Sequence, residues 1–412
     1  MNVLKDTASL ETAVRDAVAN VRITDVHTHL FPPSHDGLLL WGIDDLLTYH
    51  YLVAELFTVA PKGLTAEAFW LMPKRDQADL VWRHVFLERG GLSEAARGVI
   101  TTANALGLDI AGRDLNAIRR WFEQQDAEDY LARAFKMSNV DYAVMTNNPF
   151  LAEEADCWRR DLPRAESLKT ALRIDTLILD WPTAAVAMGQ AATPDSAAFT
   201  AARRFLANWA ARIDPLYLAA SLPPEFAYPA DTLAATIVRD VVLPAAKELN
   251  LPLAMMIGVR KRVNPALREG GDSVSPADMQ AILHLCQENP DARFLVTALS
   301  RVDQQELCVL GRKFAHLHVF GCWWFCNNPS IIEEMTRMRL EMLGTAFTCQ
   351  HSDARVLDQV IYKWAHVRKI AADVLDRTYQ DQFAAGWRPT ENEIRREVRA
   401  IFGGSFEKFI EN

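Results

Sequence analysis

The stretch Ile23-Thr24-Asp25-Val26-His27-Thr28-His29-Leu30 decides the fold, because it is a short apolar run that carries two histidines near its end. Its length and its branched side chains predict a buried strand. Alternate side chains of a strand share one face, so His27 and His29 point the same way, with their ring nitrogens close together. Such a pair can be structural, but its place at the carboxyl end of a buried strand favours metal ligation.

Seven further apolar runs predict buried strands along the rest of the chain. They cover Asp141–Thr146, Arg173–Leu179, Pro215–Ser221, Pro252–Val259, Arg293–Leu299, Leu317–Trp323 and Ala346–Ser352. Amphipathic helical patterns separate most of them, among them Asp195–Arg212, Ala230–Leu249 and Pro276–Glu288. Strands that alternate with helices indicate an α/β fold with a parallel sheet, and eight such units predict a (β/α)8 barrel of TIM type.

Residues 31–140 separate the first two predicted strands and are rich in helix formers and in Trp, Phe and Leu. We expect a helical insertion there, packed at the rim of the barrel. Its expected helices are Leu38–Phe57, Ala66–Trp70, Gln77–Phe86, Leu115–Gln124 and Ala127–Met137. No linker rich in Pro, Gly or Ser brackets the insertion, so we expect one domain over residues 1–412. Two C-terminal helices are expected at Val356–Leu375 and Glu391–Phe402.

Composition limits the classes of partner. The chain has 412 residues with 53 acidic against 44 basic side chains, and this acidic balance argues against nucleic acid. Six scattered cysteines without a CxxC pair indicate reduced thiols in a cytoplasmic protein. Met1–Arg22 has no apolar core of a secretory signal, and no apolar stretch approaches the roughly 20 residues of a membrane span. The sequence leaves open whether the chain forms a homo-oligomer.

A carboxylate completes the predicted metal site. Asp353 follows the last predicted strand, which lies beside the first in a closed barrel, so it can reach an ion held by the two histidines. Asp353 alone could instead cap the following helix. The strands predicted at Pro215–Ser221, Pro252–Val259 and Arg293–Leu299 contain no further ligand, so we expect a single divalent ion. Zinc fits two imidazoles and a carboxylate, and manganese or another divalent ion would fit as well.

A His-x-His pair on the first strand and an aspartate after the last are similar to the amidohydrolase superfamily. With its flanking sequence, this reduced ligand set resembles the uronate isomerases (glucuronate and galacturonate isomerases) over most of the chain. The matching segments are His27-Thr28-His29, His50-Tyr51, Met145-Thr146-Asn147-Asn148-Pro149, Leu172-Arg173-Ile174-Asp175, Trp323-Trp324-Phe325 and Ser352-Asp353-Ala354-Arg355. There are departures: Met256 stands where the family has a histidine, and Asn147 and Asn148 replace paired aspartates.

The resemblance implies an aldose-ketose isomerase that acts on a small sugar acid, a hexuronate, at one divalent metal ion. It implies catalytic roles for Asp353, His50 and Tyr51. Arg173 and Arg355 are the expected clamps for the substrate carboxylate, with Arg260 as a third candidate. Trp323 and Trp324 follow the seventh strand, and one of them is expected to wall the pocket.

The departures leave two alternatives open. One is a metal-dependent hydrolase of the same superfamily, acting on a lactone, an amide or another sugar-acid derivative. The other is a barrel that binds a ligand without turnover.

Overall fold

Eight parallel strands form the centre of the computed structural model, which describes residues 3–35, 37–190 and 193–411. They follow the order β1-β2-β3-β4-β5-β8-β9-β10 and curl into the expected α/β barrel of TIM type. Their bounds are β1 Ile23–Thr28, β2 Val140–Asn147, β3 Leu168–Arg173, β4 Pro215–Leu222, β5 Leu253–Ile257, β8 Phe294–Ala298, β9 Leu317–Phe320 and β10 Phe347–Thr348. The run at Pro215 therefore forms a complete strand, β4, between β3 and β5.

The strand predicted at Arg173–Leu179 was placed wrongly. The structure has β3 at Leu168–Arg173, and the apolar residues that follow form the short helix α10 (Asp175–Leu179). A short apolar run is compatible with either a buried strand or a buried helix, so its period could not separate them. Arg173 therefore ends a strand instead of beginning one. This moves its side chain to the carboxyl edge of the sheet, where active sites of this fold lie.

The barrel closes differently at its two ends. Within the described residues, β1 and β10 share no ladder, and the segment η6 (Ala400–Gly404) packs against both strands. Gly403 makes this possible, because a Cβ there would lie 2.4 Å from Cβ of Thr24. At the carboxyl end the chain after β10 joins β1 directly: the His29 N–H donates to the Ala354 carbonyl (2.8 Å). The closure brings the last segment of the barrel against the two histidines.

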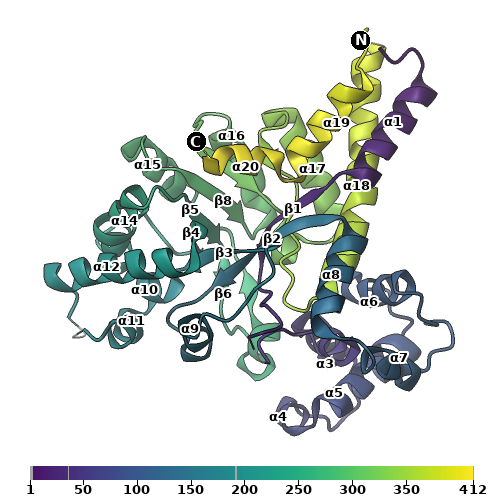
Figure 1. The fold of residues 1–412 in the computed structure, drawn as a ribbon, viewed down its shortest axis with the longest axis horizontal. Helices are drawn as coiled ribbons and strands as arrows, with labels where there is room; N and C mark the ends of the chain where they lie inside the picture. Colours follow the sequence, from purple (N-terminus) through teal and green to yellow (C-terminus); the bar gives the residue numbers. More distant parts are fainter. Residues whose placement is uncertain (1–2, 36, 191–192, 412) are drawn as a thin grey trace.

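Helices occupy the insertion between β1 and β2. They are α2 (Ile43–Leu47), α3 (His50–Val59), α4 (Ala66–Leu71), α5 (Lys74–Val81), η1 (Trp82–Leu87), α6 (Glu94–Ala105), α7 (Leu115–Phe122) and α8 (Ala127–Ser138). The sequence patterns did not predict α6, which packs against α18. Figure 1 shows α3 to α7 gathered on one side of the molecule, next to the end of α18. That residues 1–412 form one domain, with residues 31–140 as an insertion within it, stays a prediction.

The other helices cover the barrel. They are α1 (Thr7–Asn20), α9 (Ala152–Arg159), α11 (Trp181–Met188), α12 (Ser196–Ile213), α13 (Leu233–Ile237), η2 (Val238–Val242), α14 (Leu243–Glu248), α15 (Gln280–Glu288), η4 (Arg301–Asp303), α16 (Gln304–Gly311), η5 (Trp324–Cys326), α17 (Pro329–Leu343), α18 (Gln359–Ala384), α19 (Glu391–Arg399) and α20 (Ser405–Glu411). A small hairpin of β6 (Val259–Arg260) and β7 (Ser273–Val274) encloses the short helix η3 (Pro265–Gly271).

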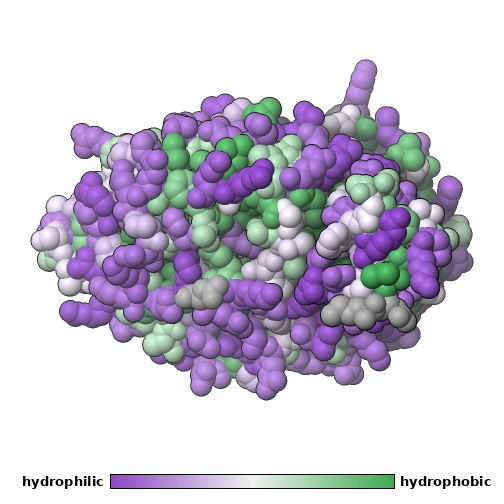
Figure 2. All heavy atoms as spheres, turned by 90° about the horizontal axis from the view of Figure 1, so that it is seen from above, coloured by the Kyte–Doolittle hydropathy of each residue, from purple (hydrophilic) through white to green (hydrophobic). Residues whose placement is uncertain are grey.

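Side chains fill the inside of the barrel. Val26, Tyr217 and Met256 belong to a buried cluster that the strands contribute from alternate positions. Met256, which stands where the family has a histidine, is thus a packed core residue with 1% exposure. The outer surface is mostly hydrophilic on the face in Figure 2, with smaller apolar areas between. In the described part of the chain, no helix combines the length and the apolar character needed to cross a membrane.

Candidate metal centre

His27, His29 and Asp353 meet at the carboxyl end of the barrel. One potential ligand atom from each lies within 4.8 Å of the others. Asp353 Oδ1 is 3.4 Å from Nε2 of His29 and 3.8 Å from Nε2 of His27. Asp353 has a left-handed φ of 51°, and its N–H donates to the His27 carbonyl (3.2 Å). Asp358 is the N-cap residue of α18, so Asp353 does not cap that helix.

A threonine sets the tautomer of His29. The Thr146 hydroxyl donates to the Thr28 carbonyl (3.0 Å), and it lies 3.0 Å from Nδ1 of His29. Because the hydroxyl hydrogen is already used, the oxygen accepts the Nδ1 hydrogen of His29. The lone pair of His29 is therefore on Nε2, which faces Asp353. A hydrogen-bond acceptor behind the ring is the usual support of a metal-binding histidine.

Tyr217 does the same for His27. Its hydroxyl donates to the Val26 carbonyl (2.7 Å) and lies 3.3 Å from Nδ1 of His27. The oxygen can then accept the Nδ1 hydrogen, which leaves the His27 lone pair on Nε2. Tyr217 belongs to β4. This strand contributes no metal ligand of its own, but it orients the ligand His27.

The charge states suit a cation. Burial lowers the pKa of His27 to about 3 and that of His29 well below its usual value, so both imidazoles are neutral, the form that binds metal. The Asp353 side chain is buried, and within the described residues its Oδ1 accepts no hydrogen bond. A buried carboxylate oxygen without a partner is costly. A divalent cation between the three side chains would satisfy it, so these residues fit such an ion.

A cavity of about 60 Å³ opens beside the ligands. The residues that line it are His29, Tyr49, His50, Arg173, Ser221, Val259, Lys261, Glu269, Asp272, Trp323, Trp324, Asp353 and Arg355. Both tryptophans line it, although only one was expected to do so. Arg260 does not: its guanidinium lies 3.8 Å from Glu225 and is more than half exposed. The next residue, Lys261, lines the cavity instead and pairs with Asp272 (2.8 Å).

The two arginines of the cavity have carboxylate partners. Arg173 donates from Nε and Nη2 to Asp175 (2.9 and 3.0 Å), which also accepts the Ser221 N–H (2.7 Å). Arg355 donates from Nη1 to Glu269 (2.5 Å). Arg173 is thus held rigidly from behind, whereas the partner of Arg355 belongs to η3 and is half exposed.

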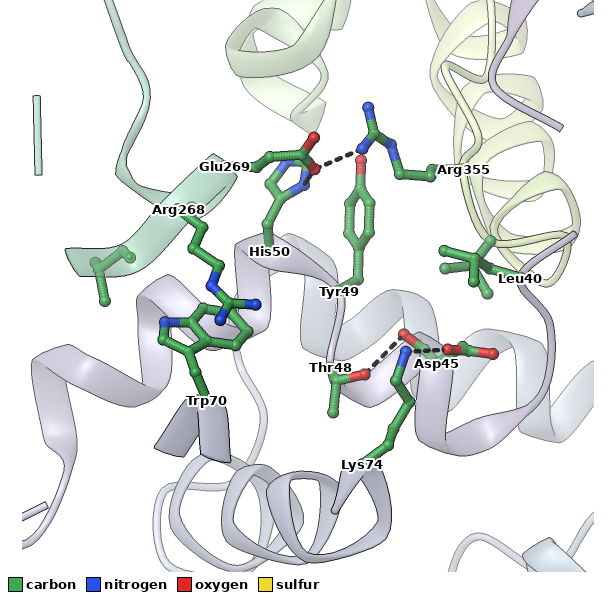
Figure 3. Close-up of a pocket in the computed structure, with 13 residues that line it drawn as sticks. Leu40, Asp45, Thr48, Tyr49, His50, Trp70, Lys74, Arg268, Glu269 and Arg355 are labelled. Atoms are coloured by element: carbon green, nitrogen blue, oxygen red, sulfur yellow. Dashed lines mark hydrogen bonds and ion pairs between the residues drawn. The ribbon is translucent and has the colours of Figure 1, made fainter. Parts of the chain in front are cut away.

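A larger cavity of about 390 Å³ lies next to the first and shares Tyr49, His50, Glu269 and Arg355 with it. Figure 3 shows the Glu269–Arg355 pair above Tyr49 and His50, and Arg268 over Trp70. The guanidinium carbon of Arg268 lies 4.4 Å from the centroid of the Trp70 ring. Ligand pockets usually hold about 300–1,000 Å³. The outer cavity is in that range and the inner one is far below it, and Glu269 and Arg355 lie where the two meet.

No protein-family model matches the chain, and no curated protein does. Among solved structures, the chain matches the crystal structure of a uronate isomerase from Bacillus halodurans C-125 with a TM-score of 0.96. The two chains are 46% identical, and the match covers 99% of this chain and 98% of the other. The chain belongs to the uronate isomerase family. The family and the fold expected from the sequence are thereby confirmed.

More distant structures share the fold of this uronate isomerase family member. A uronate isomerase from Thermotoga maritima matches with a TM-score of 0.80 at 12% identity, over 99% of this chain and 100% of that one. A glucuronate isomerase from Caulobacter crescentus matches with a TM-score of 0.78 at 17% identity, over 99% and 95%. At these identities the likeness concerns the fold alone.

His50 and Tyr51 begin α3 beside the cavity of this family member. Their rings meet edge to face, with centroids 4.6 Å apart, and the His50 ring also lies 5.3 Å from that of Trp324. Among the described residues, neither Nε2 of His50 nor the buried hydroxyl of Tyr51 has a hydrogen-bond partner. His50 lines the cavity, and Tyr51 follows it at the start of α3 with its ring against that of His50. Both groups therefore retain hydrogen-bonding capacity next to the cavity.

His351 is buried behind the ligands, 5.2 Å from the His27 ring. Its ring fills the space in front of Gly321, where a Cβ would lie 1.7 Å from Cδ2 of His351. The two asparagines that depart from the family lie at the end of β2. Asn148 accepts the Phe150 N–H (3.0 Å), whereas both side-chain polar atoms of Asn147 lack a partner within the described chain.

Sequence reasoning missed several residues of the cavity wall: Tyr49, Ser221, Lys261, Glu269 and Asp272. It also assigned no role to Asp175, which lies in the run that resembles the family. Glu269 lies in η3 and Asp272 follows it, in a polar stretch whose composition looks solvated, so no local pattern marked them.

Proposed function

We propose that the chain isomerises a hexuronate, glucuronate or galacturonate, between its aldose and ketose forms at one divalent metal ion. His27, His29 and Asp353 would hold the ion, for which zinc is our first candidate and manganese the next. The observation that carries the proposal is the 46% identity, over nearly both whole chains, to the uronate isomerase from Bacillus halodurans. The buried set of three potential ligands supports it independently.

The reaction moves protons within one molecule. The proton on C2 must reach C1, and the hydroxyl proton of O2 must reach O1, so no other reactant is consumed. The bound ion would supply a Lewis acid that polarises substrate oxygens. The side chains must then clamp the carboxylate, exclude water and carry the protons.

We assign the carboxylate clamp to Arg173 and Arg355. Asp175 occupies the Nε–Nη2 edge of Arg173 and thereby orients its Nη1 end for the substrate. Glu269 now forms an ion pair with Arg355, and the substrate carboxylate would take the place of Glu269. Trp323 and Trp324 form an apolar wall that keeps water from the reacting carbons.

We assign the proton transfers to His50, Tyr51 and Asp353. The carboxylate of Asp353 would take the O1 proton of the cyclic sugar and return it to the ring oxygen, which opens the ring. His50 would then accept the proton from C2, and the Tyr51 hydroxyl would deliver one to C1. Transfer of a proton from His50 to Tyr51 would restore both groups, and Asp353, free again after ring opening, would carry the O2 proton to O1. The support is their place beside the cavity with free hydrogen-bonding capacity.

The test combines metal content with turnover. Wild-type protein is expected to bind about one equivalent of divalent metal by elemental analysis, and His27→Ala is expected to lose it. His318→Ala is the matched control, since His318 is a buried histidine that binds Thr348 Oγ1 (2.9 Å) away from the ligands. Metal-loaded protein should convert glucuronate or galacturonate to the keto acid, followed by NMR. No conversion of either hexuronate would refute the proposal, and hydrolysis of sugar lactones instead would favour the hydrolase.

A further inference from the structure

Lys363 is a buried amine that forms no hydrogen bond within the described part of the chain. It lies in α18 with 1% of its surface exposed, and its Nζ has no hydrogen bond to any described residue. Burial of an unpaired ammonium is costly, and an apolar residue of similar volume would pack there without that cost. Packing alone therefore does not account for a lysine at this position.

The ammonium faces an aromatic ring. Lys363 Nζ lies 5.7 Å from the centroid of the Tyr51 ring, within the range of a cation–π contact. The carboxylates that act on it through space are Glu94 of α6, Asp25 of β1 and Asp353 after β10. They only partly offset burial, which lowers the pKa of Lys363.

The carboxylate of Asp25 is already engaged by other donors. It accepts the Ser352 N–H and the Trp364 indole N–H, each at 2.9 Å. Two histidines, His50 and His351, also lie within the electrostatic reach of the amine. Both are neutral, since burial lowers the pKa of each well below its usual value. The close contact of Lys363 is therefore with Tyr51.

Tyr51 contacts both Lys363 and His50. The centroid of its ring is 5.7 Å from the amine and 4.6 Å from the centroid of the His50 ring, and His50 lines the cavity. The Tyr51 hydroxyl is buried and has no partner among the described residues. Burial raises its pKa, so a phenolate there needs a compensating positive charge.

We propose that Lys363 is a positioning residue for the isomerisation: its ammonium stabilises the phenolate that Tyr51 becomes when the hydroxyl delivers a proton to C1. The proton that His50 takes from C2 then returns to Tyr51, so the pair ends as it began and Lys363 keeps its own protons. A phenolate carries a full negative charge on its ring system, which strengthens the contact with a cation over the ring. This proposal rests on the proposed function.

The kinetic test uses Lys363→Met, which keeps the length and removes the charge. We expect kcat for the hexuronate to fall roughly 100-fold with KM nearly unchanged, because Lys363 does not line the cavity. Lys363→Arg should recover part of kcat. The midpoint of thermal unfolding should rise in Lys363→Met, since an unpaired buried charge is removed. Arg339→Met is the control: this buried cation has partners in the Gly321 carbonyl and Gln304 (2.7 and 3.2 Å), so its loss should lower the midpoint.

A second measurement does not depend on turnover. A fluorinated tyrosine with a lowered intrinsic pKa is placed at position 51, and its ionisation is followed by ¹⁹F NMR in the metal-loaded protein. Loss of the charge in Lys363→Met should raise the titration midpoint by about one pH unit or more, and Lys363→Arg should leave it near the wild-type value. Lys363→Gln serves as a second neutral variant should the methionine variant not fold.

The outcomes separate the two proposals. If the titration midpoint of the tyrosine at position 51 is the same in the wild type and in Lys363→Met, the role of Lys363 is overturned, whether or not kcat falls. A raised midpoint supports that role even if the wild type converts no hexuronate, a result that would refute the proposed function alone.

Discussion

Thr146→Val should weaken metal binding by acting behind the ligand His29. The substitution keeps the shape of the side chain and removes the oxygen that accepts the Nδ1 hydrogen of His29 (3.0 Å). Without metal, the ring can move its hydrogen to Nε2 and donate to Asp353 Oδ1, which is 3.4 Å away. Metal binding to Nε2 forces the hydrogen back to Nδ1, where it has lost its acceptor. The penalty therefore falls on the metal-bound form.

Two estimates of that penalty agree. An unsatisfied buried donor costs about 1–3 kcal/mol. Loss of a hydrogen-bond partner behind a metal ligand typically costs about 10–100-fold in affinity, or roughly 1.4–2.8 kcal/mol. We therefore expect the dissociation constant for the metal to rise by about 10–100-fold in Thr146→Val.

The assay is a competition titration against a chelator of known affinity. Thr146→Ser keeps the hydroxyl and should bind metal nearly as tightly as the wild type, which separates the hydrogen bond from the loss of a methyl group. An unchanged dissociation constant in Thr146→Val, with the fold intact, would refute the assigned tautomer of His29.

Three further predictions concern the surroundings of the site. Glu269→Ala frees Arg355 for the substrate and should lower KM for the hexuronate several-fold, as expected for loss of a half-exposed ion pair worth up to about 1 kcal/mol; steady-state kinetics checks this, and a higher KM contradicts it. Burial raises the pKa of Glu154 from 4.5 to about 7, so its contribution to stability is present below pH 4.5 and is lost as the pH rises through 7. In urea unfolding, Glu154→Gln should match the wild type at low pH and be up to about 3 kcal/mol more stable above pH 7, and a pH-independent difference would contradict this. Gly321→Ala places a Cβ 1.7 Å from the His351 ring at a φ of +66° and should destabilise the protein by about 2–5 kcal/mol with loss of metal affinity; unchanged unfolding and metal titrations would show that the ring can move away.

The correction at β3 shows where sequence patterns fail. The run after Arg173 is apolar enough for a buried strand and short enough for one turn of buried helix, and the two differ only in what packs around them. Sequence patterns also could not separate Arg260 from Lys261. Arg260 ends β6 and Lys261 begins the turn after it, so the path of the chain beyond the strand decides which of the two lines the cavity.

Local sequence determined the parts of this protein that depend on period and order. The alternation in β1 places His27 and His29 on one face, and the succession of eight apolar runs indicates the barrel, because both follow from the geometry of neighbouring residues. Only the tertiary structure decided which distant groups complete the site. Thr146 and Tyr217 orient the two histidines. Glu269 forms an ion pair with Arg355, and the Lys363 amine faces the Tyr51 ring. Each of these contacts joins residues that are far apart in the chain. Lys363 looks solvated in the sequence of its helix, since burial is a property of the closed barrel and not of the residues on either side.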